Sequence, residues 1–231
     1  MSSHHSAAVA FAALLISTTL GLDAQSTGSA SPQSVWESDR LRIDRISLAA
    51  GETLAADSPA GSVIVFLTAD LDGRMPQNEA MWRDPGAANM VNHGRSRFEA
   101  LMIGFKGEMP RSTGGTPPEV VRASGMLTNM RDYGASYGTM AEARILIRND
   151  RVSVTKLRYP ADSYGYVDPV HFHPQDAVAV YLTGGYTWPT PWYYGPDRVR
   201  RGDVRIVPGN VYHNVGNAGS DPLEFLLIIP S

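Results

Sequence analysis

The sequence predicts an all-β protein, a sandwich or a barrel, made of two similar units in tandem. From Leu41 onward, short runs rich in valine, isoleucine, leucine and aromatic residues, most of them about four to eight residues long, are separated by turn-forming residues. No series of helical segments alternates with these runs, which disfavours an α/β fold. Two stretches of the first half also resemble two stretches of the second half, which indicates an internal repeat.

Eight of these runs are predicted strands. In chain order they cover residues 41–48, 62–69, 98–105, 142–148, 151–159, 177–183, 203–208 and 224–229. Turn formers such as Asn149 and Asp150 stand between neighbouring runs. A single helical segment is predicted, at residues 119–130.

The repeat becomes visible when the stretch from Ala56 is aligned with the stretch from His171, because VFLT in the first then faces VYLT in the second. A second alignment, with a different offset, places the stretch from Pro85 over the stretch from Pro208. Units of about 100 residues are a normal domain size. We therefore predict a leader at residues 1–34, a first unit at 35–110, a connection at 111–140 and a second unit at 141–231.

Composition excludes several classes of protein. The chain has 231 residues, a formal net charge of -3 and 43% hydrophobic residues, which is enough apolar content for a packed core. The near-neutral balance, without a basic run, argues against a nucleic-acid partner. The absence of cysteine excludes disulfides, thiolate metal ligands and cysteine nucleophiles, so any metal must be bound by nitrogen and oxygen atoms.

The first 34 residues are typical of a secretory signal followed by a flexible leader. The apolar stretch from Ala7 to Leu22 is shorter than the roughly 20 residues that a membrane span needs, so no membrane span is predicted. Ala24 and Ala30 are the two candidate cleavage positions. The prediction is export to the periplasm or the exterior; the alternative is an N-terminal extension of a cytoplasmic protein, since the segment before the apolar stretch contains no lysine or arginine.

His171 and His173 form an H-x-H pair in a region predicted to be β-structure. Residues two apart on a strand point to the same face, so both imidazoles can converge on one point inside a barrel. The residues around the pair resemble the first conserved motif of the cupin superfamily, with alanine in place of its glutamate; the matching positions are Gly165, His171, His173, Ala177 and Gly184. A second stretch resembles the second cupin motif, with asparagine in place of its inner glycine; it comprises Gly202, Pro208, Asn210, His213 and Asn217. Asparagine tolerates the positive φ that such a turn requires.

The resemblance implies a bicupin, that is, two jelly-roll barrels of the double-stranded β-helix type. It also implies that His171, His173 and His213 bind a divalent metal. Ala177 cannot replace the usual glutamate ligand, and Asp176 or Gln175 could do so only if the strand is bulged. Three neutral imidazoles leave coordination positions open and suit Fe(II), Ni(II), Cu(II), Co(II) or Zn(II) better than Mn(II).

In the internal alignment the first unit has no such ligand set. The residues facing His171, His173 and His213 are Ala56, Ser58 and Met90. His93 falls near Asn217, within an Asn-His-Gly sequence typical of a turn.

Two functions remain open. The first is a metal-dependent enzyme acting on a small organic molecule, plausibly a dioxygenase, because some cupin dioxygenases use three histidines; Tyr181, Tyr212 and Asp176 are then the candidate catalytic residues. The second is a non-catalytic cupin that binds a small molecule or another protein, which Ala177 and the absence of a ligand set in the first unit favour. The sequence around the two motifs also resembles a group of small, mostly uncharacterised cupins, some associated with β-alanine degradation. The aromatic loop at residues 186–194 either covers a ligand or packs against the other unit or a homodimer partner.

Overall fold

The structure, a computed structural model, describes residues 30–55, 60–69, 76–106, 142–163, 172–189, 196–210, 213 and 215–231. Within these ranges it contains fifteen strands and no helix, so the predicted all-β class is confirmed. The predicted helix at residues 119–130 lies outside them. No helix long and apolar enough to cross a membrane occurs in the described part of the chain.

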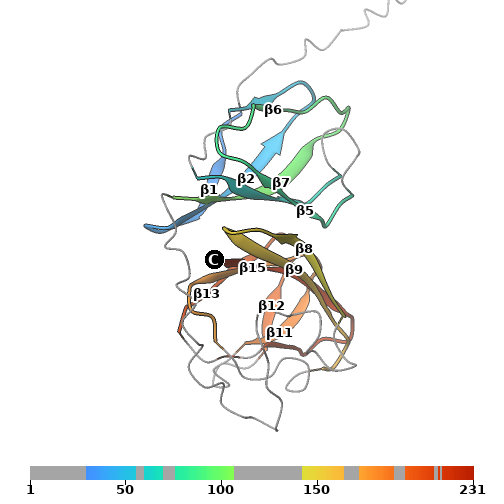
Figure 1. The fold of residues 1–231 in the computed structure, drawn as a ribbon. Coiled ribbons are helices and arrows are strands. Elements are labelled where there is room, and N and C mark those ends of the chain that lie inside the picture. Colours follow the sequence, from blue (N-terminus) through green and yellow to red (C-terminus); the bar gives the residue numbers. More distant parts are fainter. Residues whose placement is uncertain are drawn as a thin grey trace, which may run out of the picture.

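The first unit has one large and one small antiparallel sheet (Figure 1). The large sheet has the order β1-β2-β7-β4-β5, and the small sheet pairs β3 with β6. Their bounds are β1 Gln33–Glu37, β2 Leu41–Leu48, β3 Thr53–Leu54, β4 Ser62–Phe66, β5 Ala80–Arg83, β6 Met90–Val91 and β7 Phe98–Phe105. The first two residues of β1 lie within the segment assigned to the leader, and the boundary at residue 34 stays a prediction.

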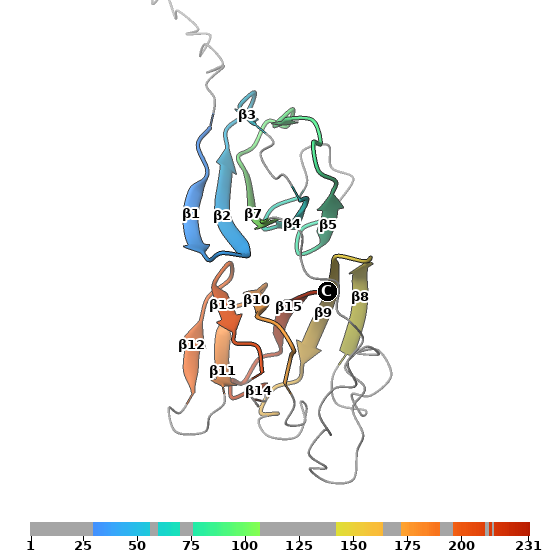
Figure 2. The same cartoon turned by 60° about the vertical axis from the view of Figure 1, so that its left-hand side comes forward.

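The second unit has the same architecture with a more complete second sheet (Figure 2). Its large sheet has the order β13-β10-β15-β9-β8, and its smaller sheet has the order β12-β11-β14. The bounds are β8 Glu142–Arg148, β9 Val152–Tyr159, β10 Ala177–Tyr181, β11 Gly185–Pro189, β12 Asp197–Val199, β13 Val204–Val207, β14 Val215–Asn217 and β15 Leu223–Pro230.

The predicted internal repeat is confirmed by the strand order and the pairing. Reading from β1 and from β8, the two large sheets connect equivalent strands in the same order. Val63 on β4 pairs with Ile103 on β7, and Val178 on β10 pairs with Ile228 on β15 in the same antiparallel register. The aligned valines therefore occupy equivalent places in the two barrels.

The first barrel is the less complete of the two. In the second unit, residues 182–203 include strands β11 and β12, whereas the described part of the corresponding connection, residues 67–79, contains no strand. The inner face of β5 is consequently less covered. Met81 lies on that face, opposite Ile64, and is nevertheless 36% exposed.

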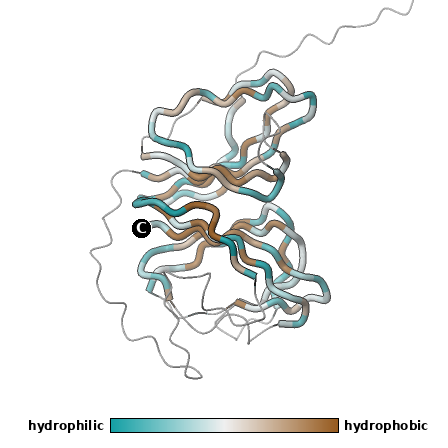
Figure 3. Tube along the Cα trace, turned by 45° about the vertical axis from the view of Figure 1, so that its right-hand side comes forward, coloured by the Kyte–Doolittle hydropathy of each residue, from teal (hydrophilic) through white to brown (hydrophobic). Residues whose placement is uncertain are grey.

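The two large sheets face each other, and apolar residues fill the layer between them (Figure 3). Side chains alternate along each strand, so Val63 and Val65 enter this layer whereas Ile64 and Phe66 enter the first barrel. In β10, Val178 and Val180 enter the layer, and the residues between them face the second barrel. Burial on both faces explains why these strands are continuous apolar runs.

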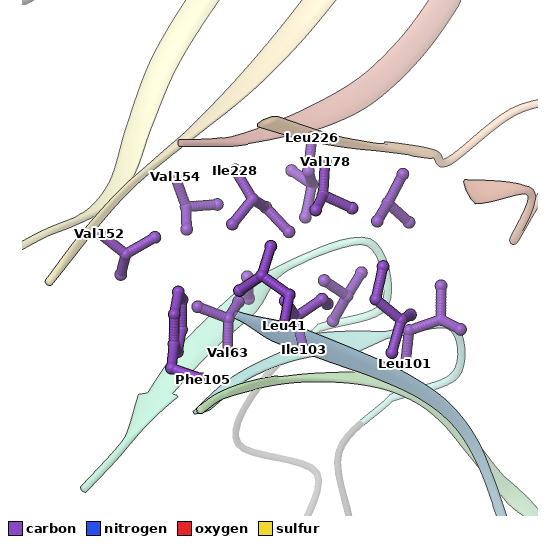
Figure 4. Packing of buried hydrophobic residues seen from close by; sticks show 14 of the residues in the cluster. Leu41, Val63, Leu101, Ile103, Phe105, Val152, Val154, Val178, Leu226 and Ile228 are labelled. Carbon is purple, nitrogen blue, oxygen red and sulfur yellow. The ribbon is translucent and has the colours of Figure 1, made fainter. Parts of the chain in front are cut away.

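Both units contribute to this single hydrophobic cluster (Figure 4). The first unit supplies Leu41, Val63, Leu101, Ile103 and Phe105 among others, and the second supplies Val152, Val154, Val178, Leu226 and Ile228. Fully burying one such side chain contributes about 1.5–3 kcal/mol. The layer is therefore a shared core, and neither unit keeps its outer sheet face dry without the other.

Polar contacts border the shared core beside the turn that precedes β13. Arg45 Nη2 donates to the carbonyl oxygen of Gly202 at 2.8 Å, and Arg201 donates to the carbonyl oxygen of Leu67. Gly202 has a φ of 80°, and a Cβ there would lie 3.2 Å from both Arg45 Nη1 and Leu67 Cδ1. The glycine that opens the second motif thus serves contact between the units.

The leader's two candidate cleavage positions differ in structural context. Ala24 lies outside the described residues. Ala30 donates its backbone N–H to Thr53 O at 3.1 Å and packs against the core of the first barrel. Cleavage after Ala24 would preserve these contacts, whereas cleavage after Ala30 would remove them; export itself stays a prediction.

Truncating either side of the shared core should destabilise both units together. We expect Ile103→Ala and Ile228→Ala each to lower the free energy of unfolding by about 2–5 kcal/mol, because each leaves a cavity in the same layer. Urea unfolding followed by circular dichroism and tryptophan fluorescence should show one cooperative transition shifted by either variant. Val35→Ala, on the exposed side of β1, should change stability by less than about 0.5 kcal/mol. Two separate transitions, each sensitive to only one isoleucine, would contradict a shared core.

Candidate metal centre

His173 and His213 lie together at one end of the second barrel. His173 precedes the short turn that leads into β10, and His213 lies between β13 and β14. Their exposed fractions are 1% and 7%, and their ring centroids are 4.9 Å apart with an angle of 40° between the ring planes. The structure therefore brings together two of the three predicted ligands; the third, His171, lies outside the described residues.

The chain holds these histidines together by binding two turns to each other. The backbone N–H of Asn210 donates to His173 O at 2.6 Å, and its side-chain Nδ2 donates to Pro174 O at 3.3 Å. The N–H of Gly209 donates to Asp176 Oδ1 at 2.8 Å. Because His173 adjoins one turn and His213 follows the other, these three bonds set the separation of the imidazoles.

The Pro208–Asn210 turn has specific residue requirements. A Cβ at Gly209 would lie 2.7 Å from the carbonyl carbon of Gln175, closer than such atoms approach, so only glycine fits without a shift. Asn210 has a φ of 58°, the left-handed conformation that asparagine tolerates. The prediction that asparagine serves in place of glycine at this position is confirmed.

The separation of the two rings is compatible with one shared metal ion. Metal–imidazole bonds of about 2.0–2.1 Å place each ring centroid about 3.2 Å from the metal, so ligand angles of about 90–110° give centroids about 4.5–5.2 Å apart. The 4.9 Å observed lies within this range. Among the described residues no group of three or more histidines and carboxylates gathers, so the described part of the site is this pair.

Asn217, the last residue of the second motif, closes the turn after β14. It is buried; its Nδ2 donates to Pro160 O at 2.9 Å and to Asp221 O at 2.7 Å, and its Oδ1 accepts from Gly219 N at 2.9 Å. Its role is therefore to fix the loop that follows the end of the barrel where the histidines lie, four residues after His213.

The same hydrogen-bond pattern occurs in the first barrel at Asn92. Its Nδ2 donates to Leu48 O at 2.9 Å and to Ser96 O at 2.8 Å, and its Oδ1 accepts from Gly94 N at 3.0 Å. Asn92, rather than His93, is thus the counterpart of Asn217. The residue that matches His213 is then Ala88, four positions before Asn92, and the predicted match with Met90 is wrong by two residues.

Solved structures share this architecture, although no protein-family model and no curated protein matches the sequence. A cupin 2 conserved barrel domain protein from Leptotrichia buccalis aligns with a TM-score of 0.54 and 15% identity, covering 88% of this chain and 91% of that one. A mutant of Bacillus subtilis oxalate decarboxylase aligns with a TM-score of 0.55 and 14% identity, covering 83% of this chain and 69% of that one. The chain is a cupin by fold.

A third solved cupin covers both barrels as well. The formate complex of Lactobacillus farciminis oxalate decarboxylase aligns with a TM-score of 0.54 and 11% identity, covering 83% of this chain and 77% of that one. Another structure of the Bacillus subtilis enzyme is described as having Mn(II) centres. The two-barrel cupin architecture predicted from the repeat is confirmed.

The position that carries glutamate in the first cupin motif is apolar here. Ala177 is the first residue of β10, fully buried, and belongs with Ala179 to the apolar cluster inside the second barrel. The carboxylate of neighbouring Asp176 accepts the Gly209 N–H in an exposed turn. Gln175 Oε1 is buried and makes no hydrogen bond within the described residues. None of these residues supplies a carboxylate beside the imidazoles.

Of the two candidate catalytic tyrosines, Tyr181 lies deep in the barrel and Tyr212 lies outside the described residues. Tyr181 shares a strand face with Ala177, four residues away, which is about 13 Å along the strand. The ring centroids of Tyr181 and Phe225 are 5.8 Å apart, and Phe225 also packs edge-on against Tyr159. The geometry thus places Tyr181 at the far end of the barrel from the start of β10.

The burial of Tyr181 should be measurable in an alkaline titration. Burial raises the pKa of the Tyr181 phenol, against a smaller opposing effect of its hydrogen bond with Thr187. The unfolded chain loses this proton near pH 10 whereas the folded chain keeps it, so Tyr181 makes the free energy of unfolding fall as the pH rises above about 10. We expect Tyr181→Phe to flatten that fall in urea unfolding series and to leave the number of tyrosines ionising in the folded protein, read at 295 nm, unchanged. A decrease of one in that number would show that Tyr181 titrates as an exposed phenol.

Proposed function

We propose that the second barrel binds a divalent transition metal through His171, His173 and His213, and that the protein is a metal-dependent oxidoreductase of the dioxygenase type acting on a small organic molecule. The observation that carries this proposal is the buried pair His173 and His213, with ring centroids 4.9 Å apart. Two buried imidazoles held close together by contacts between their turns are an arrangement that metal binding explains.

The donor set favours a metal that accepts nitrogen ligands. With Ala177 in place of glutamate and Asp176 bound to Gly209, the described residues offer imidazole and no carboxylate. Such a set suits Fe(II), Ni(II), Cu(II), Co(II) or Zn(II), whereas Mn(II) prefers oxygen. The Mn(II) centres of the Bacillus subtilis oxalate decarboxylase therefore support a divalent metal in this fold but not manganese in this chain.

The chain's own residues would prepare the site for chemistry in two ways. The imidazoles hold their positions because the two turns are hydrogen-bonded to each other. Phe172 and the alanines of β10 are buried and apolar, which keeps water away from one side of the histidines. When bound, a divalent metal supplies Lewis-acid polarisation, and iron or copper adds redox chemistry with oxygen. A small substrate would bind beside the histidines, against these apolar side chains.

A non-catalytic, ligand-binding cupin is the second candidate function. The observation that favours it is Ala177, because the fold's usual acidic ligand is replaced by a buried alanine in an apolar cluster. Stoichiometric metal separates the two candidates, since the second function needs none.

Metal content should depend on each histidine of the second barrel. After reconstitution with iron, nickel, copper, cobalt or zinc, we expect the wild type to hold about one metal ion per chain by mass spectrometry. We expect His173→Ala and His213→Ala each to lower the affinity at least about tenfold, because each removes one ligand. Affinity should also fall toward acidic pH, since protonated imidazole cannot bind a metal.

The matched control is His93→Ala, which removes an exposed histidine of the first unit and should leave metal content unchanged. A wild type without stoichiometric metal under all five conditions would refute the enzyme proposal. Metal content that is insensitive to His173→Ala and His213→Ala would refute the assignment of the site.

Replacing Ala177 by glutamate should change the metal preference. The new carboxylate would extend from the start of β10 beside the histidines, and an added oxygen ligand favours Mn(II). We expect Ala177→Glu to bind Mn(II) more tightly than the wild type and to be less stable than the wild type without metal, because a glutamate there is buried among apolar residues. Electron paramagnetic resonance titration with Mn(II) and thermal unfolding with and without the metal measure both effects. Ala177→Gln is the control of equal size; equal Mn(II) affinity of the two variants would show that position 177 does not face the metal.

A further inference from the structure

Arg83, the last residue of β5, is a buried cation in the first barrel. Its side chain is on the inner face of the sheet, since its neighbour Trp82 packs against the layer between the units. Arg83 is only 8% exposed, and it pairs across the sheet with Ser62, which is also buried. Sequence analysis did not single out either residue, because an isolated arginine or serine carries no motif.

No carboxylate neutralises Arg83 within the described part of the chain. Its guanidinium makes no ion pair there, and its one hydrogen bond is donated by Nη2 to the carbonyl oxygen of Ala88. Burial lowers the pKa of Arg83, with no compensating effect from a nearby acid. A buried charge without a partner is unfavourable, so buried arginines are usually paired with an anion.

The place of this guanidinium in the barrel corresponds to the histidine end of the second barrel. Its hydrogen-bond acceptor, Ala88, is the residue that matches His213. Ser62 precedes Val63 as Ala177 precedes Val178, so Ser62 matches the position of the missing glutamate. A cationic side chain thus stands in the first barrel where the second gathers its histidines.

On the inner face of the sheet, a glycine lies on the other side of Ser62 from Arg83. Across the strands, Ser62 pairs with Gly104, and Gly104 pairs with Arg42, so the position between Ser62 and Arg42 has no side chain. Arg42 forms an ion pair with Asp44 at 2.8 Å and is therefore not the free charge. The neighbouring Met81 is partly exposed on the same face, which shows that this side of the barrel is open.

We propose that the first barrel binds a small free carboxylate through Arg83, with the Ser62 hydroxyl as a second donor. The planar guanidinium matches a carboxylate with two parallel N–H donors, and Nη2 alone is engaged by Ala88. A single guanidinium with one hydroxyl suits a monocarboxylate. Binding would neutralise the buried charge, so the first barrel is a ligand-binding unit in its own right, independent of any metal in the second.

Acetate binding to the full chain tests this proposal. The experiment uses the His173→Ala background, so that acetate cannot bind through a metal, and compares sodium acetate with sodium chloride at constant ionic strength. Saturation-transfer NMR on the acetate methyl group reads binding, and the thermal unfolding midpoint reads stabilisation. We expect acetate, and not chloride, to raise the midpoint and give a saturable signal. Arg83→Met should abolish both effects, and Ser62→Ala should weaken binding by about three- to tenfold.

The matched control is Arg205→Met, which removes an exposed arginine paired with Asp197 and should leave acetate binding unchanged. A wild-type signal that is absent, equal in chloride, retained in Arg83→Met or lost equally in Arg205→Met would overturn the proposal. If Arg83→Met does not fold, acetate binding by the variants Arg83→Lys and Ser62→Ala tests the proposal instead. Acetate binding that is undiminished in both of these variants would then overturn the proposal, and the role of Arg83 would be limited to holding the Ala88 carbonyl.

Discussion

The apolar layer between the two large sheets is the constraint on which the rest of the structure depends. Each central strand is buried on both faces, so a slip of one residue would exchange its barrel side chains for its layer side chains. The layer therefore fixes that Ala177 and Tyr181 face the inside of the second barrel. The layer also explains why the first unit is needed although it lacks the three histidines. The first unit covers the outer face of the sheet that contains β10, the strand that begins next to the histidines.

The central strands of this layer could be predicted from sequence, whereas the edge strands β1 and β5 and the strands of the smaller sheets could not. Strands such as β4, β7, β10 and β15 each contain an unbroken apolar run of at least four residues, because both of their faces are buried. By contrast, β11 and β12 include Tyr186 and Arg198, which are exposed, so no apolar run marks them. Strand β1 is mostly exposed and its pairing with β2 is irregular at Ser34 and Trp36, which hides it within a polar leader.

The candidate site divides in the same way. Motif spacing predicts the two described histidines and the turn at Asn210, because both depend on local chain geometry. The partner of the Asp176 carboxylate could not be predicted, since it is a backbone N–H more than thirty residues away. The alignment of the two units failed at Ala88 for a related reason: their Pro-Gly turns match in sequence, but the chain after Pro208 is two residues longer before Asn217 than the chain after Pro85 is before Asn92. Only the hydrogen bonds of the two asparagines show the true match.

With that match, the two barrels differ in the charge that they place at equivalent ends. The second gathers two buried imidazoles, which we propose bind a metal cation, and has Ala177 where the cupin motif carries a carboxylate. The first carries a buried guanidinium, which has no carboxylate partner within the part of the chain that the structure describes. On these two proposals, the first end takes an anionic ligand and the second end takes a cationic one. The internal repeat thus places side chains of different charge at equivalent barrel ends, which is why the two proposals assign to these ends ligands of opposite sign.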